Sequence, residues 1–142
     1  DVTELATFEH AHYADVTGEV RDELSEAIAV ALEAGVARES IAIDPGVGFA
    51  KRSEHSLEVL RLLPRLAELG LPILVGVSNK RFIGEITGVR EPTARTSGTL
   101  GACVSALVLG ARIFRVHEVR AAREALDVAW AIVGSPTSVS SA

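Results

Sequence analysis

Polar side chains that could bind a small anionic ligand follow each of three short apolar runs in this sequence. They are Asp44 after the first run, Ser78 and Lys80 after the second, and Arg115 and His117 at the end of the third. A carboxylate can accept two N–H bonds from an amidine-like ring edge, and a guanidinium can hold a phosphate through two parallel bonds. This set of residues therefore predicts a ligand that has a hydrogen-bonding ring and an anionic group.

Asp44 stands at the start of a glycine-rich stretch, residues 44–51. Pro45 cannot donate to a β-ladder, so a strand must end there, and Gly46 and Gly48 allow the backbone to turn tightly or to approach a ligand. A charge at the carboxyl end of a buried strand costs free energy unless a partner satisfies it, and that end is where α/β proteins bind ligands. Asp-Pro-Gly is also favourable turn chemistry, so a capping role for Asp44 stays open on this segment alone.

Hydrophobic periodicity predicts helices that alternate with three strands. The strands are expected at about 40–44, 72–77 and 111–116, and the long helices at about 13–34, 53–69, 94–109 and 121–133, with a short helical turn at 82–86. Gly35 and Gly70 should end the first two helices, and Pro64 should kink or divide the second. The Ser- and Thr-rich tail, residues 134–142, is expected to be disordered.

The spacing of the strands predicts an α/β fold. The strand starts are about 32 and 39 residues apart, which is typical of βαβ units with a parallel sheet and right-handed crossovers. The carboxyl ends of parallel strands share one edge, so the polar residues should converge there. Three strands cannot close a βα-barrel, which needs eight, so the chain is either part of a larger barrel or completes its sheet with another polypeptide.

Composition excludes several classes of protein. The 142 residues carry a net charge of −5 and only six aromatic side chains, which argues against a nucleic-acid-binding protein. No apolar run reaches the roughly 18 residues of a membrane span. A single cysteine, Cys103, permits no internal disulfide and favours a cytoplasmic location, with the thiol buried as a packing residue. His10 and His12 lie two residues apart, which does not suit a metal-binding helix, so no metal site is predicted on this chain.

Three motifs resemble the C-terminal half of dihydropteroate synthase, an enzyme family of folate biosynthesis. They are residues 44–49 (Asp-Pro-Gly-Val-Gly-Phe), 75–84 (Val-Gly-Val-Ser-Asn-Lys-Arg-Phe-Ile-Gly) and 115–119 (Arg-Val-His-Glu-Val). Each alone is weak, but the three in this order and spacing are specific. The resemblance extends over about 13–133. It implies that the three strands are strands six to eight of a partial (β/α)8 barrel, and that residues 1–133 form the C-terminal part of a pterin-binding barrel.

The resemblance implies that the chain helps to condense p-aminobenzoate with a dihydropterin pyrophosphate, a transferase reaction that expels pyrophosphate. By this resemblance Lys80, Arg115 and His117 are the catalytic residues. Asp44 would accept hydrogen bonds from the pterin, and Lys80 would bind the pterin carbonyl side while its stem packs beside p-aminobenzoate. The walls of the substrate pockets would come from Gly48, Phe49, Gly76 and Ser78. Arg115 and His117 would bind the pyrophosphate, with Arg115 also over the pterin ring.

Part of the expected site is missing from this sequence. The family's first five strands, which help to hold Mg²⁺ and pyrophosphate, have no counterpart here, and Asn79 stands where the family usually has arginine. The chain alone is therefore expected to be inactive without an N-terminal half, and the family resemblance implies a homodimer formed through the last helices. Two alternatives stay open: a methyltetrahydrofolate-dependent methyltransferase on the same barrel, and an inactive half-barrel fragment.

Overall fold

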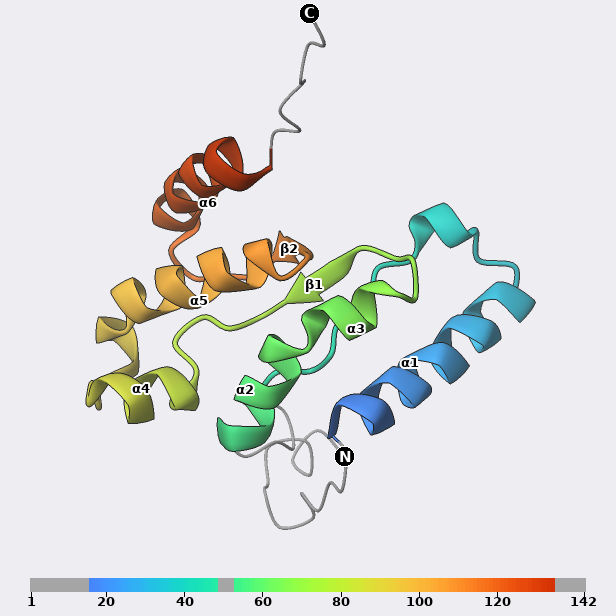
Figure 1. Cartoon of the computed structure of the whole chain (residues 1–142), viewed down its shortest axis with the longest axis horizontal. Coiled ribbons are helices and arrows are strands. Elements are labelled where there is room, and N and C mark those ends of the chain that lie inside the picture. Colours follow the sequence, from blue (N-terminus) through green and yellow to red (C-terminus); the bar gives the residue numbers. More distant parts are fainter. Residues whose placement is uncertain (1–15, 49–52, 135–142) are drawn as a thin grey trace, which may run out of the picture.

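A computed structural model describes residues 16–48 and 53–134 of the chain (Figure 1). The α-helices are α1 (Val16–Glu33), α2 (Ser53–Arg61), α3 (Leu63–Ala67), α4 (Arg81–Thr87), α5 (Thr96–Val108) and α6 (Val119–Val133). The strands are β1 (Ile73–Val75) and β2 (Ala111–Phe114), and the short 3-10 helices are η2 (Arg38–Ser40) and η3 (Pro92–Ala94). The tail predicted to be disordered lies outside the described residues, apart from Gly134.

The strands are parallel, which confirms the predicted α/β class. Strand β1 pairs with β2, and Ile43 forms an isolated parallel bridge with Ile73 on β1. The prediction of a full strand at 40–44 is therefore wrong. The backbone bonds from Ile43 N to Pro72 O (2.9 Å) and from Leu74 N to Ile43 O (2.8 Å) are the pairing that remains. The segment is short because η2 ends at Ser40 and Pro45 cannot donate to a ladder.

The predicted helices are present, and the long second one is divided. Pro64 lies in the first turn of α3, where its missing N–H costs no hydrogen bond, so the chain breaks into α2 and α3 rather than bending one helix. Helix α1 ends in a left-handed Gly35 with φ of +89°. The bonds from Gly35 N to Leu32 O and from Val36 N to Ala31 O close that end as a Schellman motif.

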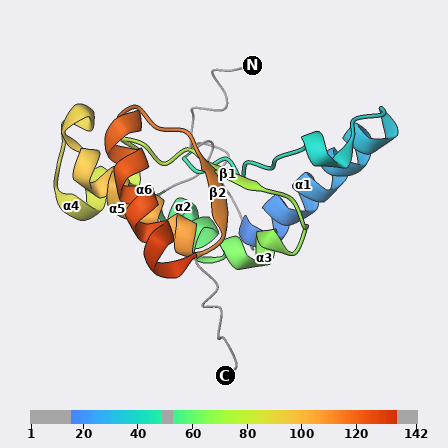
Figure 2. The same ribbon diagram turned by 90° about the horizontal axis from the view of Figure 1, so that it is seen from above.

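The helices are spread along the sheet, and α3 lies nearer to α1 than α2 does (Figures 1 and 2). Helix α1 lies at one end, α2 and α3 in the middle, and α4 to α6 at the other end, in both views (Figures 1 and 2). The core lies between helices and strands, with Val59, Leu63 and Leu66 each 0% exposed. None of the helices in the described part of the chain is both long and apolar enough to cross a membrane.

One face of the sheet keeps apolar side chains that the described residues do not fully cover. Ile73 and Val75 on β1 are buried, whereas Leu74 between them is half-buried. Its partner in the register is Ile113 on β2, which is 39% exposed. Within the described residues β2 pairs only with β1. In a parallel sheet such a face is normally covered by another packed layer. An edge of this kind is a template for pairing with a further strand.

Cys103 lies at the centre of α5 and is fully buried, which confirms its prediction as a packing residue. Burial raises the pKa of its thiol to about 11, so the thiol stays protonated at neutral pH. We expect iodoacetamide at pH 8 to modify it slowly in the native chain and rapidly after unfolding in denaturant, because the thiolate is the nucleophile. Mass spectrometry over time measures this, and equally fast modification in both states would contradict it.

Candidate functional site

The polar residues that follow the strands gather around one cavity of about 580 Å³ at the carboxyl edge of the sheet. It is lined by Gly76, Ser78, Asn79, Lys80, Pro92, Thr93, Arg115, Val116 and His117. Most of the residues that the sequence places in the substrate site therefore line this cavity. Two others lie next to lining residues: Gly48 lies against Lys80, and Asp44 lies beside Arg115. Phe49 lies outside the described residues. The parallel order of the strands explains the gathering, because all their carboxyl ends point to the same edge.

A carboxylate and two cations meet at the rim of the cavity. Asp44 Oδ2 lies 3.8 Å from Arg115 Nη2, and Asp44 Oδ1 accepts a bond of 2.9 Å from Gly46 N. The second contact is the turn geometry that the Asp-Pro-Gly sequence allows, so Asp44 both caps the turn and faces Arg115. The two side chains are 37% and 58% exposed, so this ion pair contributes at most about 1 kcal/mol to folding.

Lys80 is close enough to both charges to be affected by them. Its pKa is lowered, first by burial and then by repulsion from Arg115, while the Asp44 carboxylate acts in the opposite direction. The site therefore holds more positive charge than its own carboxylate balances. An anion bound nearby would counter the repulsion from Arg115, which is one of the two influences that lower the Lys80 pKa.

Two glycines bring the backbone close to these cations. A Cβ atom added at Gly48, which has φ of +78°, would lie 2.9 Å from Lys80 Cδ. One added at Gly76 would lie 2.6 Å from Arg115 Nη2 and 2.9 Å from Arg115 Cζ. The absence of a side chain at each position therefore leaves the space that the lysine stem and the guanidinium occupy.

Replacing Gly76 by alanine should displace the Arg115 guanidinium without unfolding the chain, because the atoms in the way are the far end of a flexible side chain. We expect pyrophosphate affinity to fall about 10-fold, the loss of one charge-assisted hydrogen bond, as measured by calorimetry. The control is Gly101→Ala on α5, where an added Cβ would meet nothing within 4 Å. It should leave affinity unchanged, and equal affinities in both variants would contradict the expectation.

Ser78 and His117 are joined across the two strand ends. Ser78 Oγ lies 2.7 Å from His117 Nδ1, and it accepts a bond of 3.2 Å from the His117 backbone N–H. Asn79, which the sequence did not place in the site, also reaches the ring, with Nδ2 3.4 Å from His117 Nδ1. Its backbone N–H donates to Thr99 Oγ1 on α5 at 3.0 Å.

Arg95 is a second residue that the sequence did not indicate. Its guanidinium donates to the carbonyl oxygens of Val89 at 2.9 Å, Arg90 at 2.6 Å and Asn79 at 3.0 Å. It thereby ties the loop after α4 to the segment after β1, and this loop carries the two lining residues of η3. No local pattern could reveal this role, because the carbonyl acceptors lie up to sixteen residues earlier in the chain.

The side chains around the cavity, among residues 16–48 and 53–134, do not fit a magnesium ion. Within the described residues no group of three or more His, Cys, Asp or Glu side chains could hold a metal. None of the residues that line the cavity is acidic, and Asp44 lies beside Arg115. The Mg²⁺ that the sequence resemblance implies stays a prediction about pyrophosphate and about groups beyond this chain.

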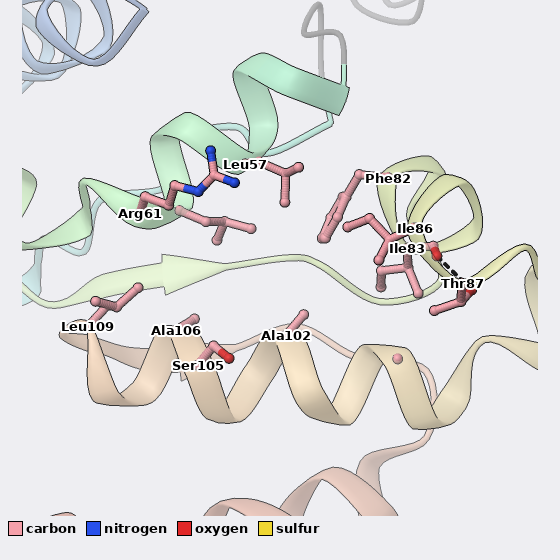
Figure 3. Close-up of a pocket in the computed structure, with 12 residues that line it drawn as sticks. Leu57, Arg61, Phe82, Ile83, Ile86, Thr87, Ala102, Ser105, Ala106 and Leu109 are labelled. Atoms are coloured by element: carbon pink, nitrogen blue, oxygen red, sulfur yellow. Dashed lines mark hydrogen bonds between the residues drawn. The ribbon is translucent and has the colours of Figure 1, made fainter.

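A second cavity, of about 360 Å³, lies between α2, α4 and α5. Figure 3 shows Leu57 and Arg61 from α2, Phe82 and Ile86 from α4, and Ala106 from α5 around it. Its lining is almost wholly apolar, and it contains none of the predicted site residues. It is therefore separate from the polar cavity.

The fold and the cavity define a parallel α/β protein with a polar cavity at its strand ends. The family model of pterin binding enzymes matches residues 3–117. The chain belongs to this family.

The relatives and solved structures that it resembles are dihydropteroate synthases. The enzyme of Neisseria meningitidis serogroup C is 44% identical over 123 residues, which are 86% of this chain and 43% of that protein. The structure from Thermus thermophilus in complex with 4-aminobenzoate is 46% identical with a TM-score of 0.84, covering 88% of this chain and 48% of that one. The Xanthomonas albilineans structure in complex with 7,8-dihydropteroate is 44% identical with a TM-score of 0.84, covering 88% and 48%. The chain thus spans less than half the length of these proteins.

Proposed function

We propose that this chain is the C-terminal half of a dihydropteroate synthase barrel. The complete protein would condense p-aminobenzoate with 6-hydroxymethyl-7,8-dihydropterin pyrophosphate, giving dihydropteroate and pyrophosphate. The observation that carries the proposal is the meeting of Asp44, Lys80 and Arg115 at one edge, with Asp44 3.8 Å from Arg115 and both charges acting on Lys80. Such a set suits a ring with an anionic substituent, and the similar solved proteins bind 4-aminobenzoate and 7,8-dihydropteroate.

The residues would act mainly by positioning and by stabilising charge. Asp44 would accept hydrogen bonds from the pterin, Lys80 would bind its carbonyl side, and Arg115 with His117 would hold the pyrophosphate. The amine of p-aminobenzoate would attack the pterin methylene carbon, the C–O bond to pyrophosphate would break, and the surplus proton on the amine nitrogen would pass to solvent. The departing group gains negative charge, so cations placed beside it lower the barrier. A neutral aniline needs no strong base.

The missing part of the barrel would cover the open face of the sheet. Strands from an N-terminal half would pair with the free edge of β2 and bury Leu74 and Ile113, which are only partly buried here. These strands would complete the substrate site and supply the groups that help pyrophosphate to hold Mg²⁺. By the same reasoning the chain alone would be inactive.

The test is a chimera in which the N-terminal part of the Xanthomonas albilineans enzyme precedes this chain. We expect release of pyrophosphate that depends on both substrates, measured by a coupled phosphate assay, from the chimera and not from the chain alone. A folded chimera without p-aminobenzoate-dependent release would overturn the proposal. Methyl transfer from methyltetrahydrofolate to a corrinoid protein, with no need for pyrophosphate, would instead support the methyltransferase alternative.

We also propose that α6 forms a homodimer interface. Val128 and Ile132 lie one helical turn apart on this helix and are 63% and 76% exposed. Unpartnered apolar side chains of this kind are typical of a contact surface. Ile132→Asp should shift the chimera from dimer to monomer in sedimentation experiments. Val30→Asp on α1, at a residue that is 65% exposed, should not; a dimer that survives Ile132→Asp would contradict the proposal.

A further inference from the structure

The contacts around Asn79 bear on which nitrogen of the neutral His117 ring carries the proton. The Asn79 backbone N–H can only donate, so Thr99 Oγ1 is its acceptor at 3.0 Å. The hydroxyl proton of Thr99 is then available for Asn79 Oδ1, 3.4 Å away. Thr99 is 4% exposed, so water does not compete freely for this hydroxyl. The structure places the side-chain oxygen of Asn79 toward this hydroxyl.

The orientation of the Asn79 amide fixes what His117 must do. With Oδ1 toward Thr99, the amide nitrogen Nδ2 faces His117 Nδ1 at 3.4 Å. An amide NH₂ group only donates, so Nδ1 must be an acceptor without a proton. Ser78 alone would not decide this, since its hydroxyl could either donate to Nδ1 at 2.7 Å or accept from it. Asn79 is therefore the residue that selects between the two tautomers.

We propose that Asn79 is a positioning residue that holds neutral His117 with its proton on Nε2. Ser78 then donates its hydroxyl proton to Nδ1, while its oxygen accepts the backbone N–H of His117. The Nε2–H group lies on the other side of the ring and donates to an anionic oxygen in the cavity that His117 lines. This inference rests on the proposed function only for the identity of that anion, a phosphate group of the substrate.

The backbone at Asn79 suits this role. Its φ of +58° lies in the left-handed region, which asparagine tolerates better than most residues. Arg95 donates to the Asn79 carbonyl at 3.0 Å, so the residue is held from both sides of its backbone. A residue fixed in this way can orient a neighbouring ring with little loss of conformational freedom.

Nitrogen NMR of the chain with 15N-labelled histidine tests the inference at a pH where the imidazole is neutral. His117 is assigned by the signal that disappears in His117→Gln. We expect Nδ1 to give the signal of an unprotonated nitrogen and Nε2 that of a protonated one. Asn79→Asp replaces the NH₂ group by a carboxylate oxygen, which can only accept a hydrogen bond from Nδ1. The proton should then lie on Nδ1, so the signals of the two ring nitrogens should exchange. Predominant protonation of Nδ1 in the unaltered chain, or no change in a folded Asn79→Asp variant, would overturn the inference.

Two uncharged variants and one ligand complete the test. Asn79→Gly keeps the backbone conformation but removes the amide, and Thr99→Val releases the amide, so each should give a mixture of tautomers. Inorganic pyrophosphate added to the unaltered chain should shift the Nε2 signal. Pyrophosphate that leaves Nε2 unchanged at any concentration would overturn the donor role. Failure of the chimera to release pyrophosphate is a separate outcome, because the tautomer is measured without any reaction.

Discussion

Replacing Asp44 by asparagine in the chimera should weaken binding of the pterin substrate at least about 100-fold while the fold is kept. Two charge-assisted hydrogen bonds are lost, each contributing about 1.5–3 kcal/mol. Asparagine can still accept the 2.9 Å bond from Gly46 N through Oδ1. It must then present its NH₂ group toward Arg115 and the ligand, where the carboxylate oxygen lies now. The new NH₂ group would face the N–H donors of Arg115 on one side and those of the pterin on the other.

The same variant should change the pH dependence of binding in a defined direction. Burial and Arg115 both lower the Lys80 pKa, and Asp44 is the influence that raises it. Without the carboxylate the Lys80 pKa should fall further, so binding that needs the ammonium group is lost at a lower pH than in the unaltered protein. Calorimetric affinities measured across neutral and alkaline pH would reveal this shift.

Asp22→Asn is the matched control for Asp44→Asn. Asp22 lies on α1 with its side chain 80% exposed, and it pairs with Arg21 at 4.0 Å. Its replacement should leave pterin affinity unchanged. The free energy of unfolding should change by no more than about 1 kcal/mol in either protein, because each substitution removes at most one exposed ion pair. Equal pterin affinity in Asp44→Asn and Asp22→Asn would remove Asp44 from the site.

The convergence of Asp44, Lys80 and Arg115 could be predicted from the sequence because it needs only one rule. Apolar runs separated by helical segments make parallel strands, and the residues after such strands share an edge. The positions of these residues follow from chain order, without knowledge of any side-chain contact.

The strand predicted at 40–44 failed for a physical reason. The β-branched residues Ile41 and Ile43 have the intrinsic preference for a strand, but that preference is realised only by pairing with neighbours. Here Ile43 bonds to β1 on one side, and no described strand lies on its other side. In a complete barrel a further strand would stand there.

The roles of Asn79 and Arg95 could not be predicted from sequence because they depend on contacts far along the chain. Asn79 meets Thr99 twenty residues later and His117 on the next strand end. The substitution of Asn79 for the family's usual arginine was visible in the sequence. The contacts of the Asn79 amide with Thr99 and His117 are visible only in the structure.

Replacing Arg115 by lysine should lower the affinity for pyrophosphate about 10-fold. Lysine keeps the positive charge but is a point charge on a flexible stem, and it cannot hold a phosphate through two parallel bonds. The guanidinium also occupies a place that the lack of a side chain at Gly76 leaves open. A Cβ atom added at Gly76 would lie 2.6 Å from Arg115 Nη2. An ammonium group would not fill that place. Loss of one charge-assisted bond corresponds to roughly this factor.

The comparison that isolates geometry from charge is Arg120→Lys. Arg120 lies in the first turn of α6, its side chain is 94% exposed, and it pairs with Glu124 one turn later at 3.0 Å. Both substitutions leave the net charge unchanged, so an affinity that depended on charge alone would be the same in both variants as in the unaltered protein. A loss confined to Arg115→Lys would assign the effect to the guanidinium fork at the strand edge. Unchanged affinity in both variants would mean that the bidentate geometry of the Arg115 guanidinium does not hold pyrophosphate.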